Sequence, residues 1–333
     1  MPHAHLDALV DDLFARPRDE GVTSALVVRH RGELIAERYG VRPADTFRPE
    51  IRITADSTLT SWSMAKSITH AAVGILVGDG LLDVDAPAPV PEWAGTPKAA
   101  ITTLQLLEMR SGLRFVEDYV DDAVSHCIEM LFGDSGPSHA AYAAALPLDH
   151  QPGTDFSYSS GTTNIVARII GDIVTHGADI DAADPQQRRA AVESFLHDRL
   201  FEPIAMGSAI PKFDDAGDFV GSSYVFATAR DFARFGELYR HDGITVDGTR
   251  ILPTGWLEHA RTPVSHDDDS GCDYGRHWWM WPEIPGSLAC HGHEGQYIVV
   301  VPERELVLVH LGRTDAAAAP ELRARLCSLV EAV

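Results

Sequence analysis

The sequence has few basic residues, and this shortage excludes one large class of partners. Its 333 residues include 27 lysines and arginines against 49 aspartates and glutamates, which gives a formal net charge of -22. Nucleic-acid binding depends on cations that neutralise backbone phosphates, so we expect no nucleic-acid partner. Lysine is the scarcer base, with Lys66, Lys98 and Lys212 alone, and each is therefore a candidate for a special role.

Cysteine is also scarce and follows no metal-binding or disulfide pattern. The four residues, Cys127, Cys272, Cys290 and Cys327, form no C-x-x-C pair. Their scatter disfavours a structural zinc site and a disulfide framework, so we expect reduced thiols.

Long apolar runs are missing as well. The longest, such as residues 71–77 and 297–301, fall well short of the roughly 20 residues that cross a bilayer, so we expect a soluble protein without a membrane span. The first residues form an amphipathic acidic pattern without the basic and apolar regions of a signal peptide. We therefore expect a cytoplasmic location.

Both ends of the chain show strand patterns. Residues 24–30 and 33–39 are β-rich and are separated by Arg31-Gly32, which predicts a hairpin. Residues 296–301 and 305–311 flank Pro302 and predict a second hairpin, followed by helical spacing over 320–330. The two ends are therefore expected to share one antiparallel sheet.

Helical patterns dominate the middle of the chain. They cover residues 103–109, 123–132, 163–174, 189–200 and 229–240. This order predicts an α+β fold with a sheet domain built from 1–75 and 245–333 and a mostly helical lobe over 76–244.

The sharpest chemical signal is Ser63-Met64-Ala65-Lys66, an S-x-x-K sequence at the start of a helical pattern. Positions i and i+3 share a helix face, so Lys66 should stand over Ser63. A lysine activates a serine when burial lowers its pKa, and the helix N-terminus favours a developing oxyanion. The alternative is that Ser63 caps a helix and Lys66 is solvated, because such short matches arise by chance.

Five motifs decide between these readings: Ser63–Lys66, Leu107–Leu113, Tyr158–Asn164, Ala227–Gly236 and His291–Gln296. They occur in the order seen in the serine β-lactamase-like family. Over about residues 25–311 the sequence resembles the branch of class C β-lactamases, D-alanyl-D-alanine peptidases, β-lactamase-like carboxylesterases and 6-aminohexanoate-dimer hydrolases. The resemblance implies a β-lactamase/transpeptidase-like fold, with its active site in the cleft between sheet and helical lobe.

The resemblance also assigns roles to individual residues. It makes Ser63 the acylated serine, Lys66 its partner base and Tyr158 the tyrosine that relays the proton to the leaving group. The family's Tyr-x-Asn motif here ends in Ser160, which lacks the carboxamide that holds a substrate amide in β-lactamases.

The sheet-edge Lys-Thr-Gly motif of the family corresponds to Cys290-His291-Gly292 and lacks its lysine. In this alignment, which could shift by one or two residues, the N–H of His293 joins that of Ser63 in the oxyanion hole. His291, Gly292 and Ser160 are further oxyanion or substrate-binding candidates.

Three other candidates have plain alternatives. His291 and His293 form an H-x-H without a third ligand at a metallohydrolase spacing, so no metal is expected. Trp279 either borders the cleft or belongs to the core. Tyr119 resembles the tyrosine that contacts the substrate amide in 6-aminohexanoate-dimer hydrolases, or is a loop tyrosine.

Together these patterns predict a serine hydrolase that forms an acyl-enzyme on a small carboxylic ester or linear amide, with no cofactor. No G-x-S-x-G elbow or nucleotide-binding glycine motif competes with this prediction. Two alternatives stay open: β-lactamase or D-alanyl-D-alanine peptidase activity, and a sensor that binds acyl compounds or peptides without turnover. The oligomeric state is not predicted.

Overall fold

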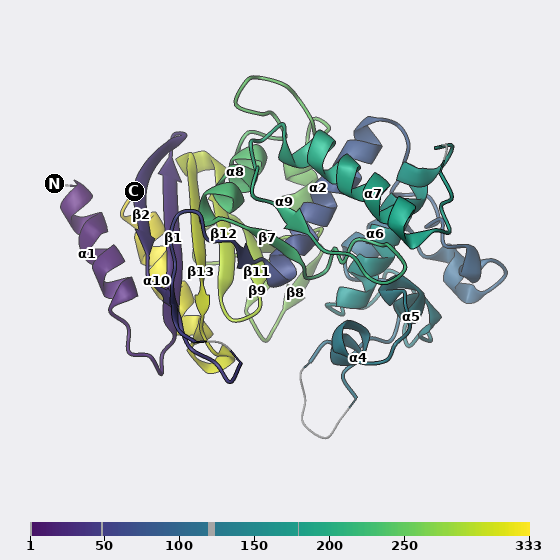
Figure 1. Cartoon of the computed structure of the whole chain (residues 1–333), viewed down its shortest axis with the longest axis horizontal. Helices are drawn as coiled ribbons and strands as arrows, with labels where there is room; N and C mark the ends of the chain where they lie inside the picture. The colour runs from purple at the N-terminus through teal and green to yellow at the C-terminus, as the bar shows by residue number, and fades with distance from the viewer. Residues whose placement is uncertain (1, 48, 119–123, 179) are drawn as a thin grey trace.

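The computed structural model of the chain describes residues 2–47, 49–118, 124–178 and 180–333. Within them, an eight-stranded antiparallel sheet lies beside a mostly helical lobe (Figure 1). The strand order is β2-β1-β13-β12-β11-β10-β9-β8. The strands are β1 (Val22–His30), β2 (Glu33–Tyr39), β8 (Ser265–Asp267), β9 (Cys272–Tyr274), β10 (Trp279–Met280), β11 (Leu288–Gly292), β12 (Gln296–Val301) and β13 (Leu306–Arg313).

The sheet joins the two ends of the chain, as the sequence predicts. β1 pairs on one side with β2, with Val27 opposite Glu37, and on the other with β13, with Val27 opposite Val309. The expected β12–β13 hairpin is also present. The predicted α+β fold is therefore confirmed.

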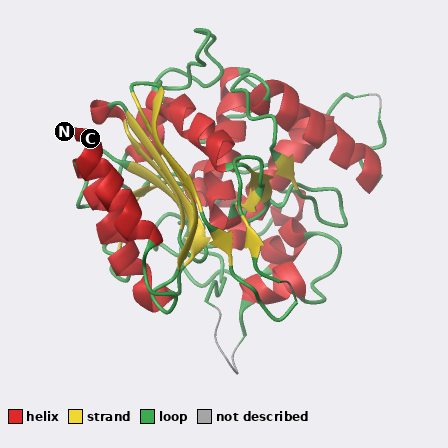
Figure 2. Ribbon diagram, turned by 60° about the vertical axis from the view of Figure 1, so that its left-hand side comes forward, coloured by secondary structure: helices red, strands yellow, loops and turns green. Residues whose placement is uncertain are grey.

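Both faces of the central strands are buried. Successive side chains alternate between the two faces, so each strand contributes to two cores. Leu26 and Val28 pack with the helices at the chain ends, α1 (Pro2–Phe14) and α10 (Ala319–Glu331). Ala25 and Val27 face the opposite core, which includes α8 (Ala229–Arg240). Figure 2 shows helices on both sides of the twisted sheet.

The helical lobe supplies most of the remaining helices in the described residues. They are α2 (Ala65–Gly78), α3 (Thr103–Leu107), α4 (His126–Phe132), α5 (His139–Ala145), α6 (Ser160–Thr175), α7 (Pro185–Leu196) and α9 (Trp256–Arg261). Two short pairings lie outside the main sheet. β3 (Val41–Arg42) pairs with β4 (Ile51–Arg52), and β7 (Val225–Ala227) pairs with β6 (Ile210–Pro211) and with β5 (Leu59–Thr60), which precedes the turn that carries Ser63.

The predicted domain boundaries stay a prediction. α8 falls inside 76–244, yet its buried side chains join the core beneath the sheet. In the described part of the chain, none of the helices has the length and apolar character required to span a bilayer.

Candidate active site

The turn that carries Ser63 is fastened to β7. Ser61 N donates to Val225 O at 2.9 Å, and Val225 N donates to Ser61 Oγ at 3.0 Å. The next residue, Trp62, has a φ of 44°, a left-handed conformation that is costly for a bulky side chain. Such strain persists only where the surroundings enforce it, and it clusters at functional sites.

Ser63 begins a continuous helical run. A short 3₁₀ helix over Trp62–Met64 leads directly into α2. Lys66 follows one turn later, and its Nζ donates to Ser63 Oγ at 3.0 Å, as the i to i+3 spacing predicts. The serine and its candidate base are therefore joined by one hydrogen bond.

Lys66 is buried, with 2% of its surface exposed. Its Nζ also donates to Ser160 Oγ at 3.0 Å and to Ser222 O at 3.2 Å. Three acceptors match the three hydrogens of an ammonium. Burial lowers the pKa of Lys66, while the charge of Glu117 and, more weakly, Cys127 oppose that shift. The neutral form of the Lys66 amine is thus easier to reach than that of a lysine on the protein surface.

Tyr158 covers the lysine from the loop before α6. Lys66 Nζ lies 4.7 Å from the centre of the Tyr158 ring. Desolvation and the charge of Glu117 raise the pKa of Tyr158 far above its usual range, and a hydrogen bond with Ser63 opposes this rise. A neutral phenol that contacts both Ser63 and Lys66 can accept and return a proton in one step.

Ser160, where the family motif has asparagine, lies between Lys66 and a carboxylate. Its Oγ donates to Glu117 Oε1 at 2.6 Å, and its N–H donates to Glu117 Oε2 at 2.7 Å. Both hydroxyl partners are protein groups, so the substrate-binding role predicted for Ser160 stays a prediction.

The third acceptor of Lys66 is held by the only asparagine in the sequence. Ser222 N donates to Asn164 Oδ1 at 3.3 Å, and Asn164 lies on α6. The sequence analysis missed Ser222 and Glu117. A backbone carbonyl such as that of Ser222 has no sequence signature, and Glu117 lies in a loop far from Ser160 in sequence.

The β11–β12 hairpin reaches the turn that carries Ser63. At Gly292, an added Cβ would lie 2.4 Å from Ser61 O, so only glycine permits this approach. The exposed ring of His293 meets Trp62 edge-on, with ring centres 5.6 Å apart. The hairpin therefore lies beside the turn that carries Ser63, while the oxyanion role of the His293 N–H stays a prediction.

His291 points into an aromatic cluster. Its ring stacks on Trp279 at 5.0 Å, and its Nε2 accepts from Trp281 Nε1 at 2.6 Å. Burial lowers the pKa of His291 to about 3, so the ring is neutral near pH 7. Trp279 is buried and lies 5.4 Å from the Tyr158 ring. It therefore belongs to the core and also supports Tyr158, and its role toward substrate stays a prediction.

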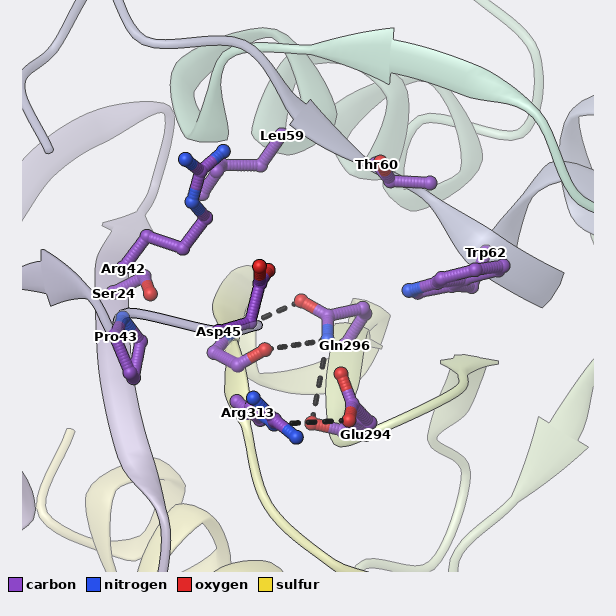
Figure 3. Close-up of a pocket in the computed structure, with 11 residues that line it drawn as sticks. Ser24, Arg42, Pro43, Asp45, Leu59, Thr60, Trp62, Glu294, Gln296 and Arg313 are labelled. Atoms are coloured by element: carbon purple, nitrogen blue, oxygen red, sulfur yellow. Dashed lines mark hydrogen bonds and ion pairs between the residues drawn. The ribbon is translucent and has the colours of Figure 1, made fainter. Parts of the chain in front are cut away.

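Trp62 lines one cavity, and its neighbour Tyr224 lines a second. One, of about 150 Å³, is lined by Trp62, the charged Arg42 and Asp45, and the Arg313–Glu294 ion pair at 3.1 Å (Figure 3). On another side Trp62 contacts Tyr224, with ring centres 5.8 Å apart. Tyr224 lines a larger, partly aromatic cavity of about 520 Å³. The smaller cavity thus lies against the turn that carries Ser63, and the larger one is connected to that turn through the contact between Tyr224 and Trp62.

Tyr119 and the H-x-H pair are the remaining candidates from the sequence. Tyr119 lies outside the described residues. His291 and His293 have no metal-binding companions, because no group of three or more His, Cys, Asp or Glu side chains among the described residues could hold an ion.

Most of the chain matches a known protein family. The family profile described as Beta-lactamase matches residues 6–326 of the chain. The chain is 28% identical over 330 residues to a 6-aminohexanoate-dimer hydrolase of Paenarthrobacter ureafaciens, covering 93% of this chain and 78% of that protein.

Solved structures show the same fold. A putative 6-aminohexanoate-dimer hydrolase from Bacillus anthracis superimposes with a TM-score of 0.71 at 23% identity, covering 98% of this chain and 82% of that one. A family VIII carboxylesterase superimposes with a TM-score of 0.71 at 16% identity, covering 99% and 96%.

Proposed function

The chain belongs to the β-lactamase family, and we propose that it is a serine hydrolase that acts by acyl transfer on a carboxylic ester or a linear amide. The observation that carries the proposal is the hydrogen bond of 3.0 Å between Ser63 Oγ and the Nζ of the buried Lys66. A lysine activates a serine only where burial gives access to its neutral amine, and Lys66 meets that requirement.

The proposed reaction has two halves. In the first, Ser63 Oγ attacks the carbonyl carbon and its proton passes to the neutral Lys66 amine, while the N–H groups of Ser63 and His293 hold the oxyanion. Lys66 then returns the proton through Tyr158 to the leaving oxygen or nitrogen as its bond to carbon breaks. In the second half, a water molecule attacks the acyl carbon and gives a proton to Lys66, and the proton returns to Ser63 Oγ as its bond to the acyl carbon breaks and the acid leaves.

Two features favour an ester or linear amide over a β-lactam. β11 carries no lysine where the family motif has one, and His291, in that segment, is neutral near pH 7. The position of the motif's asparagine carries Ser160, whose hydroxyl is engaged by Lys66 and Glu117. The carboxylate of a β-lactam would therefore lack its lysine partner, and the side-chain amide would lack its asparagine partner.

A substrate panel tests the proposal. We expect kcat/KM for short-chain p-nitrophenyl esters or for a 6-aminohexanoate dimer to exceed that for nitrocefin by about 100-fold or more, since each lost polar contact costs about 1–3 kcal/mol. The Ser63→Ala variant, folded by circular dichroism, should lose turnover of every substrate. Nitrocefin hydrolysis as fast as that of p-nitrophenyl butyrate would favour a β-lactamase, and no turnover at all would favour the acyl-binding sensor.

A further inference from the structure

A carboxylate next to the proton-transfer groups has no part in the reaction described above. Glu117 lies in the loop before α4, 43 residues from Ser160 in sequence. Its two oxygens accept from the Oγ and the backbone N–H of Ser160, at 2.6 and 2.7 Å. Because Ser160 is the first residue of α6, the carboxylate also lies at the positive end of that helix dipole.

These bonds fix the orientation of the Ser160 hydroxyl. A hydroxyl has a single hydrogen, and Glu117 accepts the one on Ser160. The bond of 3.0 Å between Ser160 and Lys66 must then have Lys66 as the donor. Glu117, Ser160 and Lys66 thus form a chain in which every hydrogen bond points toward the carboxylate.

We propose that Glu117 is a positioning residue for Lys66. Acting through Ser160, Glu117 stabilises the ammonium that forms when Lys66 takes the proton of Ser63. The inference rests on the proposed function, because it assigns a partner to the base of that reaction. The step itself is unchanged: the Ser63 O–H bond breaks, an N–H bond forms on Lys66, and the serine oxygen bonds to the carbonyl carbon. The new positive charge appears two hydrogen bonds from the Glu117 carboxylate.

The other groups around Lys66 do not supply this charge. His277, in the loop between β9 and β10, is fully buried, and burial lowers its pKa well below the usual range, so it is neutral. Tyr158 is neutral because desolvation raises its pKa. Cys127, on α4, favours the ammonium more weakly than Glu117 does. Glu117 is therefore the main group opposing the effect of burial on Lys66.

The pH dependence of ester hydrolysis tests the proposal. The acid limb of kcat/KM reports deprotonation of the base in the free enzyme. Glu117→Gln removes a negative charge that favours the ammonium, so the limb should move to lower pH. At its plateau, kcat should fall by about 10- to 100-fold, because a weaker base accepts the proton less readily. Glu117→Asp keeps the charge and should leave the limb near its original position.

Two further variants keep the test decisive. Ser160→Ala removes an acceptor of Lys66 and should move the limb in the same direction, even if Glu117→Gln fails to fold. Glu129→Gln removes an exposed carboxylate from α4 and should change neither the limb nor kcat. An acid limb that coincides in Glu117→Gln, Ser160→Ala and the unmodified protein overturns the proposal. Turnover that survives in Ser63→Ala instead overturns the proposed function.

Discussion

At the scale of single residues, the candidate site combines a poor nucleophile with two groups that can move its proton. Lys66 contacts Ser63 from the next helical turn, and Tyr158 approaches from a segment far along the chain. The ammonium is favoured by the Tyr158 ring, 4.7 Å away, and disfavoured by burial. Burial thus favours the neutral amine, which can accept a proton, and the Tyr158 ring favours the ammonium, which can donate it.

If Lys66 and Tyr158 act as one unit, their substitutions should not add. We expect Lys66→Ala and Tyr158→Phe each to lose about 100-fold or more of kcat on an ester, while the double variant loses little more than the worse single variant. Steady-state kinetics on the three proteins, each checked by circular dichroism, measures this. Unreduced ester turnover in either single variant would show that the catalytic residues are misplaced.

The sequence could predict those residues of the site that belong to spaced motifs. Ser63 and Lys66 share a helix face, and Tyr158 begins a motif of the resembling family. The Glu117–Ser160 contact could not be predicted, because it joins a loop to a helix N-terminus across 43 residues and depends on tertiary packing. The Asn164–Ser222 contact was missed for the same reason.

At the scale of elements, hydrophobic patterns predicted α3, α4, α6, α7, α8 and α10 but not the short helices α5 and α9, and capping residues set where several of the predicted helices begin. α6 starts at Ser160 instead of residue 163, because Ser159 Oγ accepts from Thr162 N at 3.0 Å. α7 starts at Pro185 instead of 189, because Asp184 caps it and proline suits the first helical position. α4 starts at His126, after Ser125, whose Oγ accepts from Ile128 N at 3.2 Å, and residue 123 of the predicted range lies outside the described residues.

The long strands could be predicted, but the short edge strands could not. β1, β12 and β13 are rich in β-branched and apolar residues, and β2, which also holds Glu33, Glu37 and Arg38, is joined to β1 by the turn at Arg31-Gly32. β8, β9 and β10 have only two or three residues each, too few for a period to show. β10 pairs with β11, and β9 and β8 follow outward from it, while Gly292 of β11 lies against the turn that carries Ser63.

At the scale of the whole molecule, the sheet closes the chain ends together and buries several histidines. His70, His277 and His310 each expose 2% or less of their surface. His310 lies on β13, where its Nδ1 bonds to Gly295 O at 2.7 Å and its Nε2 to Thr23 Oγ1 at 3.0 Å. Burial lowers the pKa of His310 to about 3 and those of His70 and His277 well below the usual range.

These histidines should make the fold sensitive to acid. Unfolded, each titrates near pH 6.5, whereas the folded protein binds their protons only at much lower pH. Their stabilising effect is complete above about pH 6.5 and is lost progressively as the pH falls toward 3. Each pH unit in that range should cost about 1.4 kcal/mol per buried histidine.

Urea unfolding between pH 7.5 and 4.5 measures this loss. We expect His310→Gln to have a shallower pH dependence than the unmodified protein, because one fewer proton is taken up on unfolding. His5→Gln, at an exposed position on α1, should leave the slope unchanged. A free energy of unfolding that stays constant down to pH 4.5 would contradict this account of the buried histidines.

The central claim is that Ser63 forms a covalent acyl-enzyme, and active-site labelling tests it most directly. A serine-directed phosphonate should add one adduct to the protein, which mass spectrometry of the digested chain should place on Ser63. The Ser63→Ala variant should remain unlabelled and should hydrolyse no ester. An adduct mapped to another serine, such as Ser159, or ester turnover that persists in Ser63→Ala, would contradict the account.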